Sequence, residues 1–185
     1  MTPNEIEKHI VRYGDLIPCK TAFIDAHTPG SDQKENFTII GGGVSESADQ
    51  HVHLRETPGF NIGAAGQPPQ CRNSLHIHTT AEVFFVLKGR WRFFWGRWGT
   101  AGEVTLEEGD IINIPTGIFR GFENIGSDYG MIMAILGGDD AGGKPALRLP
   151  PTCRGGACRW GEHQAGRGGD ARGPGPGEGP GRPPG

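Results

Sequence analysis

Two histidines and a glutamate stand close together near the middle of this chain, in the stretch LHIHTTAEVFF. One residue separates His76 from His78, and in a β-strand this spacing points both imidazoles to the same face. Glu82 follows after three further residues. Divalent first-row metals accept two histidine nitrogens and a carboxylate oxygen, which is also the facial ligand set of non-haem iron(II) oxygenases. The sequence therefore predicts a metal site on His76, His78 and Glu82.

Two longer motifs surround and follow these residues. LHIHTTAEVFFVLKG, residues 75–89, resembles the first conserved motif of the cupin superfamily, HxHx3Ex6G. GDIINIPTGIFRGFEN, residues 109–124, resembles the second, Gx5PxGxxHx3N, with Gly109, Pro115, Gly117 and Asn124 in place. The resemblance implies a double-stranded β-helix, or jelly-roll, barrel and a homodimer. It leaves the reaction open, because cupins include dioxygenases, decarboxylases, isomerases, lyases and non-catalytic binders.

One position departs from the second motif. The family has a histidine there, its fourth metal ligand, and this chain has Arg120. A guanidinium has five donors and no acceptor, so it cannot bind a cation. Strand alternation nevertheless predicts that Arg120 points inward with Phe122 and Asn124.

Three interpretations of Arg120 remain open. In the first, which we prefer, His76, His78 and Glu82 hold the metal alone and Arg120 is the catalytic residue that orients a substrate carboxylate, which its planar fork suits. In the second, the metal is lost and Arg120 forms a salt bridge with Glu82. In the third, Arg120 turns away and a side chain of the pair His51 and His53 takes the place of the missing ligand.

His51 and His53 form a second HxH pair. We interpret them as polar residues near a barrel mouth. If they face inward, we expect them to bind substrate by hydrogen bonds rather than to bind metal. Cys71, five residues before His76, is interpreted as a buried and inert thiol.

Alternating β-prone stretches indicate an all-β domain of about ten strands, among them TAFID, NFTIIG, EVFFVLK and YGMIMAILG. We expect the barrel to occupy residues 18–140. Residues 1–17 are predicted to form a short amphipathic helix that begins with the capping box of Thr2 and Glu5 and packs outside the barrel through Ile6 and Ile10. In the hairpin RWRFFWGRWG, Trp91, Phe93 and Trp95 share a face, which is expected to line the core or an interface.

Composition limits the remaining classes. Residues 141–185 are rich in Gly, Pro and Arg, and we expect them to be disordered because they offer little apolar surface to bury. The formal net charge of −3, without a basic stripe, argues against nucleic acid as a partner. No stretch reaches the roughly 18 apolar residues of a membrane span. The N-terminus lacks the features of a secretory signal, so we expect a cytoplasmic protein with free thiols.

These observations lead to one expectation of function. We expect a metal-dependent cupin enzyme of the non-haem Fe(II) dioxygenase type that acts on a small organic acid. Mn(II), Ni(II) and Zn(II) are alternative metals, because the same ligand set accepts several of them. The rivals are a metal-dependent cupin lyase or isomerase, and a non-catalytic cupin that binds a small molecule without a metal.

Overall fold

The computed structural model describes residues 1–138 and 146–147. The predicted disorder of residues 141–185 therefore lies almost entirely outside the described residues. The helical segments are α1 (Pro3–Ile6) and the 3-10 turns η1 (Glu7–His9), η2 (Tyr13–Asp15) and η3 (Ile24–His27). The strands are β1 (Glu35–Ile40), β2 (Val52–Leu54), β3 (Phe60–Gln67), β4 (Arg72–Ile77), β5 (Glu82–Lys88), β6 (Trp91–Trp95), β7 (Gly102–Leu106), β8 (Ile111–Ile114), β9 (Arg120–Asn124), β10 (Gly130–Gly137) and β11 (Ala146–Leu147).

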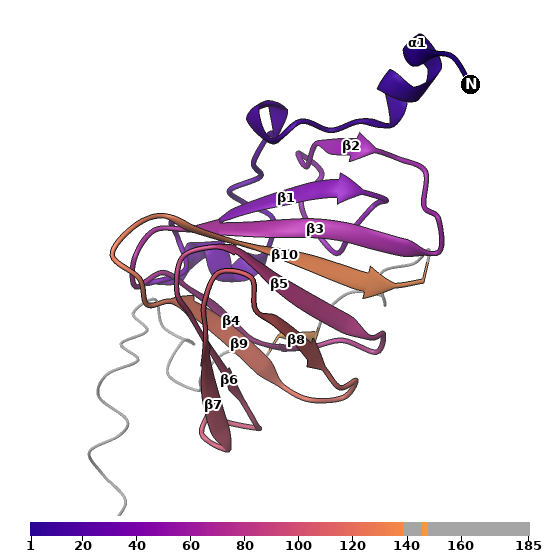
Figure 1. Cartoon of the computed structure of the whole chain (residues 1–185). Coiled ribbons are helices and arrows are strands. Elements are labelled where there is room, and N and C mark those ends of the chain that lie inside the picture. Colours follow the sequence, from indigo (N-terminus) through magenta and orange to yellow (C-terminus); the bar gives the residue numbers. More distant parts are fainter. Residues whose placement is uncertain (139–145, 148–185) are drawn as a thin grey trace, which may run out of the picture.

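The strands form two sheets that pack face to face (Figure 1). One sheet has the order β2-β1-β3-β10-β5-β8 and the other the order β11-β4-β9-β6-β7. Apart from the parallel pair of β1 and β2, neighbouring strands run antiparallel. The prediction of an all-β jelly-roll barrel with a short N-terminal helix is confirmed.

The core between the sheets is aromatic. Trp91 and Phe93 are fully buried and Phe122 nearly so. The ring of Phe84, from the six-stranded sheet, lies 5.2 Å from that of Phe93 and 5.3 Å from that of Phe122 in the other sheet. Such tilted and edge contacts add to the free energy that burial of the rings contributes. Trp91 and Phe93 therefore line the core, as expected, whereas Trp95 at the end of β6 is only half-buried.

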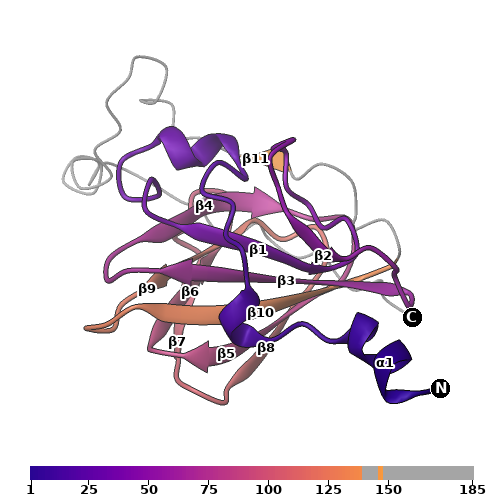
Figure 2. The same ribbon diagram turned by 90° about the horizontal axis from the view of Figure 1, so that it is seen from above.

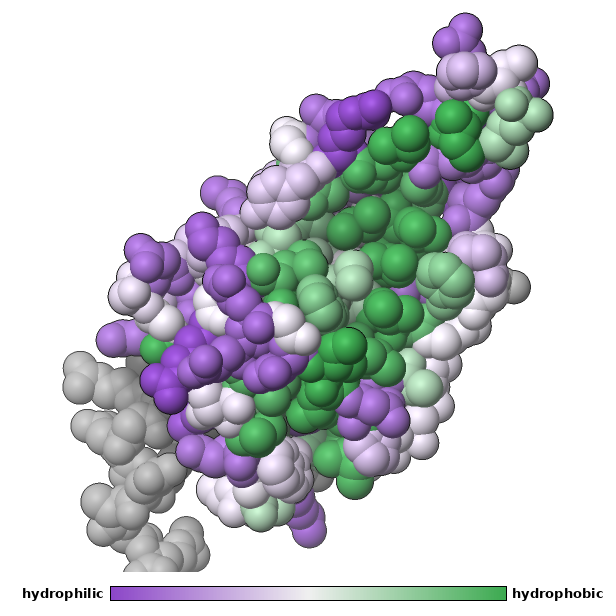
Figure 3. All heavy atoms as spheres, viewed as in Figure 1, coloured by the Kyte–Doolittle hydropathy of each residue, from purple (hydrophilic) through white to green (hydrophobic). Residues whose placement is uncertain are grey.

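The outer face of the six-stranded sheet is also hydrophobic. Figure 3 shows apolar residues gathered across it. Leu16, Ile39 and Tyr129 cover one part by packing on Phe37, Ala64 and Met131. Ile111 on β8 stays 64% exposed. The expected homodimer stays a prediction.

The N-terminal segment differs from its prediction. The capping box is present, since Glu5 N–H donates to Thr2 and Thr2 N–H donates to the Glu5 carboxylate. The α-helix covers only four residues, however, and Ile6 and Ile10 are 44% and 43% exposed. The expected packing on the barrel was wrong because this segment extends away from the sheets, as the two perpendicular views show (Figures 1 and 2).

The stretch TAFID was expected to be a strand and is not one. It leads into the 3-10 turn η3. Asp25 is fully buried there, and its Oδ2 accepts a hydrogen bond of 3.0 Å from the Ser74 amide of β4. This long-range contact, which local alternation does not reveal, holds the stretch against the barrel as a turn. No helix in the described part of the chain has the length and hydrophobicity that crossing a membrane requires.

Candidate functional site

A β-bulge in β4 brings the polar residues of this strand onto the inner face. Asn73 pairs with Phe122 of β9, and His76 pairs with Arg120, with a shift of register between the two pairs. Asn73 and His76 are three positions apart in the sequence, so regular alternation would place them on opposite faces. The bulge adds the extra residue that turns both inward. Asn73, His76 and His78 consequently line the same cavity.

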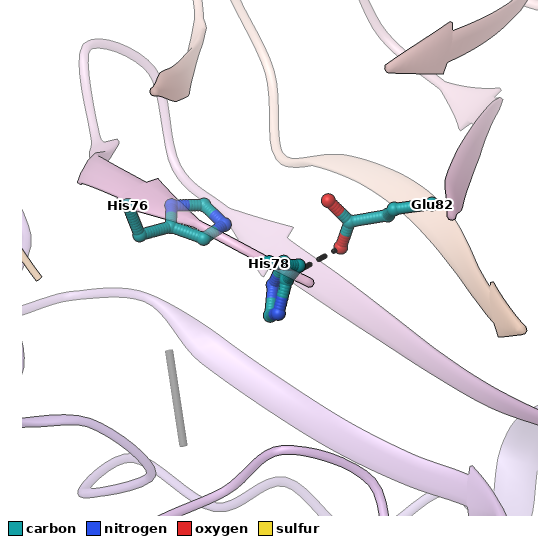
Figure 4. A group of neighbouring side chains, drawn as sticks. All are labelled: His76, His78 and Glu82. Carbon is teal, nitrogen blue, oxygen red and sulfur yellow. Dashed lines mark ion pairs between the residues drawn. The ribbon is translucent and has the colours of Figure 1, made fainter. Parts of the chain in front are cut away.

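His76, His78 and Glu82 come together as the sequence predicts (Figure 4). All three are buried, and one ligand atom of each lies within 4.8 Å of the others. His78 Nε2 and Glu82 Oε1 are 3.6 Å apart. Glu82 stands at the first position of β5, where pairing with Ile114 and Leu136 on either side fixes its backbone.

Both imidazoles are neutral. Burial, followed by the charge of Arg120, lowers the pKa of His76 well below its ordinary value and that of His78 to about 3. Nδ1 of His76 donates to the Ser74 carbonyl over 2.9 Å, which leaves Nε2 with the lone pair. Nδ1 of His78 has no hydrogen-bond partner among the described residues. Neutral imidazole is the form that binds metals, so both side chains are ready to act as ligands.

Arg120 forms a buried ion pair with Glu82. Its Nε donates to Glu82 Oε2 over 3.0 Å, and Nη2 donates to the same oxygen. Nη1 lies 3.5 Å from the Ile118 carbonyl. Burial raises the pKa of Glu82, and the charge and hydrogen bonds of Arg120 oppose that rise. Because Oε2 is occupied, Oε1 is the oxygen that Glu82 presents to the histidines.

The position of Arg120 bears on all three interpretations of this residue. It points inward as predicted, with 1% exposure, so the third interpretation, in which it turns away, is wrong. It is not among the residues that line the cavity, and the substrate-orienting role of the first interpretation stays a prediction. The ion pair expected by the second interpretation is present, and it coexists with a complete set of three metal-ligating side chains.

His51 and His53 lie elsewhere. They flank Val52 on the edge strand β2, and neither lines the cavity. His53 Nδ1 donates to the Thr38 carbonyl over 2.7 Å, while Nε2 accepts from the Ile17 amide over 3.1 Å. His53 therefore ties the N-terminal segment to β1. The expectation that these histidines bind substrate finds no support in their positions.

The cavity itself is small and mostly apolar. Its volume of about 80 Å³ is several times smaller than typical drug-sized sites of about 300–1,000 Å³. Its apolar wall includes Phe23, Val44, Ala65, Phe84, Phe122, Ala134 and Leu136. A molecule of only a few heavy atoms fits beside the histidines and Glu82.

Cys71 does not line this cavity. It is 4% exposed, and burial raises the pKa of its thiol to about 11. A thiol with that pKa is almost wholly protonated near neutral pH and is a poor nucleophile. This agrees with the interpretation of Cys71 as inert.

Sequence reasoning missed two amides on the cavity wall, Asn36 of β1 and Asn73 of β4. Asn36 could have been found, because strand alternation in NFTII places it on one face with Thr38. Asn73 could not, since its inward direction depends on the bulge.

Comparisons with known proteins agree with the fold. The family model for the cupin domain matches residues 66–136, from β3 to β10. No curated protein matches the chain. A structure of the DMSP lyases RdDddP and RnDddQII is 18% identical in sequence and superposes with a TM-score of 0.55. The match covers 72% of this chain and 63% of the chain in that structure. The DMSP lyase DddQ from Ruegeria pomeroyi DSS-3 is 18% identical with a TM-score of 0.50, over 65% of this chain and 54% of its own.

The oxalate decarboxylase of Lactobacillus farciminis, in a formate complex, is 15% identical with a TM-score of 0.51 and covers 72% of this chain. Only 34% of that decarboxylase is matched, and this chain spans less than two thirds of each of the three structures. At these identities the likeness establishes the shared barrel.

Proposed function

Because residues 66–136 form a cupin domain, we propose that the chain is a metal-dependent cupin enzyme that binds one divalent cation through His76, His78 and Glu82. The observation that carries the proposal is the gathering of these three buried side chains, one ligand atom of each within 4.8 Å of the others, at the wall of a cavity.

The residues fit such a cation. Ligand bonds of about 2.0–2.2 Å place neighbouring ligand atoms roughly 3 Å apart. The distance of 3.6 Å between His78 Nε2 and Glu82 Oε1 needs only a small adjustment. The hydrogen bond from His76 Nδ1 to the Ser74 carbonyl fixes the ring with Nε2 as the ligand, a support that metal-binding histidines usually have.

Arg120 acts here on Glu82 rather than on the substrate. By holding Oε2, it orients the carboxylate so that Oε1 faces the histidines. Its charge and hydrogen bonds oppose the rise that burial causes in the pKa of Glu82, and so favour the ionised form that a metal ligand requires. Arg120 stands where the cupin motif has its fourth metal ligand, and here it positions the third ligand, Glu82.

Fe(II) is the metal we propose, since two histidines and a carboxylate with open positions are typical of non-haem iron oxygenases. Bound there, iron would supply one-electron and O2 chemistry. The apolar wall of the cavity excludes bulk water and holds the hydrocarbon part of a small organic acid. The reaction we propose is an O2-dependent oxidation of that acid.

The first test is metal content. Protein purified without chelator and reconstituted with Fe(II) under argon should hold about one metal per chain by elemental analysis. Glu82→Ala and His76→Ala should each hold little. Oxygen uptake is then measured over a panel of small carboxylic acids. Metal-loaded protein that consumes no O2 but eliminates or isomerises a substrate would replace the oxygenase proposal with the lyase or isomerase alternative.

The Arg120–Glu82 ion pair favours a second candidate, a cupin that binds a small molecule without metal. Arg120 already neutralises Glu82, which is the only carboxylate among the cavity-lining residues that the structure describes. Wild-type protein that stays metal-free after reconstitution with Fe(II), Mn(II), Ni(II) and Zn(II), yet binds a small molecule, would establish this candidate in place of the enzyme.

A further inference from the structure

Two side-chain amides share the cavity with the candidate metal ligands. Asn36 lies on β1 and pairs with Ala65 of β3, while Asn73 lies on β4 and pairs with Phe122 of β9. Both line the cavity that His76, His78 and Glu82 also line. Nδ2 of Asn36 is buried and has no hydrogen-bond partner among the described residues. A buried donor without a partner is costly in a native structure and needs an explanation, which a ligand would supply.

A buried ion pair fixes the orientation of the second amide. Lys34 and Asp25 are both fully buried and form a salt bridge. Lys34 Nζ also lies 3.5 Å from Oδ1 of Asn73. An ammonium group has donors and no acceptor, so it holds the oxygen of the Asn73 amide toward itself. Nδ2 of Asn73 is then the atom left to donate to a molecule in the cavity.

The charges around the cavity indicate what that molecule carries. Glu82 with Arg120, and Asp25 with Lys34, form two buried pairs that are each electrically neutral. A divalent cation on His76, His78 and Glu82 would therefore leave its two positive charges unbalanced in a site of low dielectric. A small organic anion offsets that charge, whereas a neutral molecule does not.

We propose that Asn36 and Asn73 form the substrate subsite of this cavity and that they bind one oxygen-bearing end of a small carboxylate whose charge the metal balances. The substrate class is a monocarboxylate of a few heavy atoms, because the cavity is about 80 Å³ and its remaining wall is apolar. This inference rests on the proposed function, since it requires the cation.

The test uses acetate and acetamide, which have nearly the same shape and differ in charge, with protein loaded with Mn(II). Bound Mn(II) broadens the methyl proton resonance of a ligand close to it, so weak binding is measurable without turnover. Acetate should bind and acetamide should bind at least tenfold more weakly. Asn36→Leu and Asn73→Leu should each weaken acetate binding by about tenfold, the loss of one hydrogen bond to a charged group.

Thr38→Val is the matched control. Thr38 lines the same cavity on the same strand as Asn36, but its hydroxyl already donates to Gln50 Oε1 over 2.9 Å. Its removal should change acetate affinity less than twofold. If Asn36→Leu does not fold, Asn36→Asp keeps the shape, replaces the donor with a negative oxygen, and should abolish acetate broadening.

The outcomes separate the two proposals. Asn variants that hold full metal and bind acetate like the wild type would overturn the amide subsite and leave the metal site intact. Equal binding of acetamide and acetate to metal-loaded protein would overturn the substrate class. A wild type without metal would overturn the proposed function, and this inference with it, because the charge that attracts the carboxylate would be absent.

Discussion

Two buried ion pairs in the described part of the chain, Asp25–Lys34 and Glu82–Arg120, use their carboxylates differently. Both oxygens of Asp25 are engaged, Oδ1 by Lys34 and Oδ2 by the Ser74 amide. Two nitrogens of Arg120, Nε and Nη2, donate instead to one oxygen of Glu82, and the other oxygen faces His78 at 3.6 Å. The first carboxylate is saturated by the protein and joins the segment around η3 to β1 and β4. The second keeps one oxygen available among two neutral imidazoles, which is what a metal ligand needs.

The saturated pair should have the largest effect on stability. Asp25→Ala leaves Lys34 buried without a counter-charge, and breaking such a pair costs about 3–5 kcal/mol. We expect the free energy of unfolding, measured by urea denaturation, to fall by that amount. The double variant Asp25→Leu with Lys34→Met removes both charges and should recover most of the loss. A double variant as unstable as Asp25→Ala would show that packing rather than charge dominates there.

Metal should restore stability when the Arg120–Glu82 pair at the candidate metal site is broken, but not when the Lys34–Asp25 pair is broken. Arg120→Met and Lys34→Met each leave a buried carboxylate unpaired, so each metal-free variant should lose about 3–5 kcal/mol in the free energy of unfolding. Mn(II) at a hundredfold excess over its Kd adds about 2.7 kcal/mol by binding the native state. In Arg120→Met the cation also replaces the missing positive charge on Glu82.

Metal should therefore stabilise Arg120→Met more than the wild type, and Lys34→Met no more than the wild type. Thermal unfolding with and without Mn(II), on the three proteins side by side, measures this difference. If metal stabilised the two variants equally, the distinction between a saturated and an available carboxylate would not hold.

Sequence patterns predicted one of these regions much better than the other. His76, His78 and Glu82 follow from spacing within seven residues, and the inward direction of Arg120 follows from period-two alternation along β9. The partner of Arg120 stayed one of three open alternatives, because Glu82 is 38 residues away and meets it only in the folded barrel.

The region around Asp25 escaped prediction for related reasons. Its contact to Ser74 spans 49 residues, and the bulge that turns Asn73 inward has no counterpart in simple alternation. The stretch TAFID has strand-forming residues, yet the buried contacts of Asp25 determine its shape. At the N-terminal helix the local feature, the capping box, was predicted correctly. The packing of the helix was not, because it depends on the direction in which the whole segment extends.

We expect the two buried pairs to stabilise the fold because they are buried, and not merely because their charges are opposite. An exposed pair tests this. Arg90 and Glu107 lie 3.5 Å apart with side chains 59% and 71% exposed. Solvent screens such charges, and ordering two long side chains offsets the attraction that remains. Arg90→Ala should leave the urea midpoint and the metal content unchanged within error. A loss of stability approaching that of Asp25→Ala would mean that charge pairing stabilises this barrel wherever it occurs, and the contrast between its buried pairs would lose its basis.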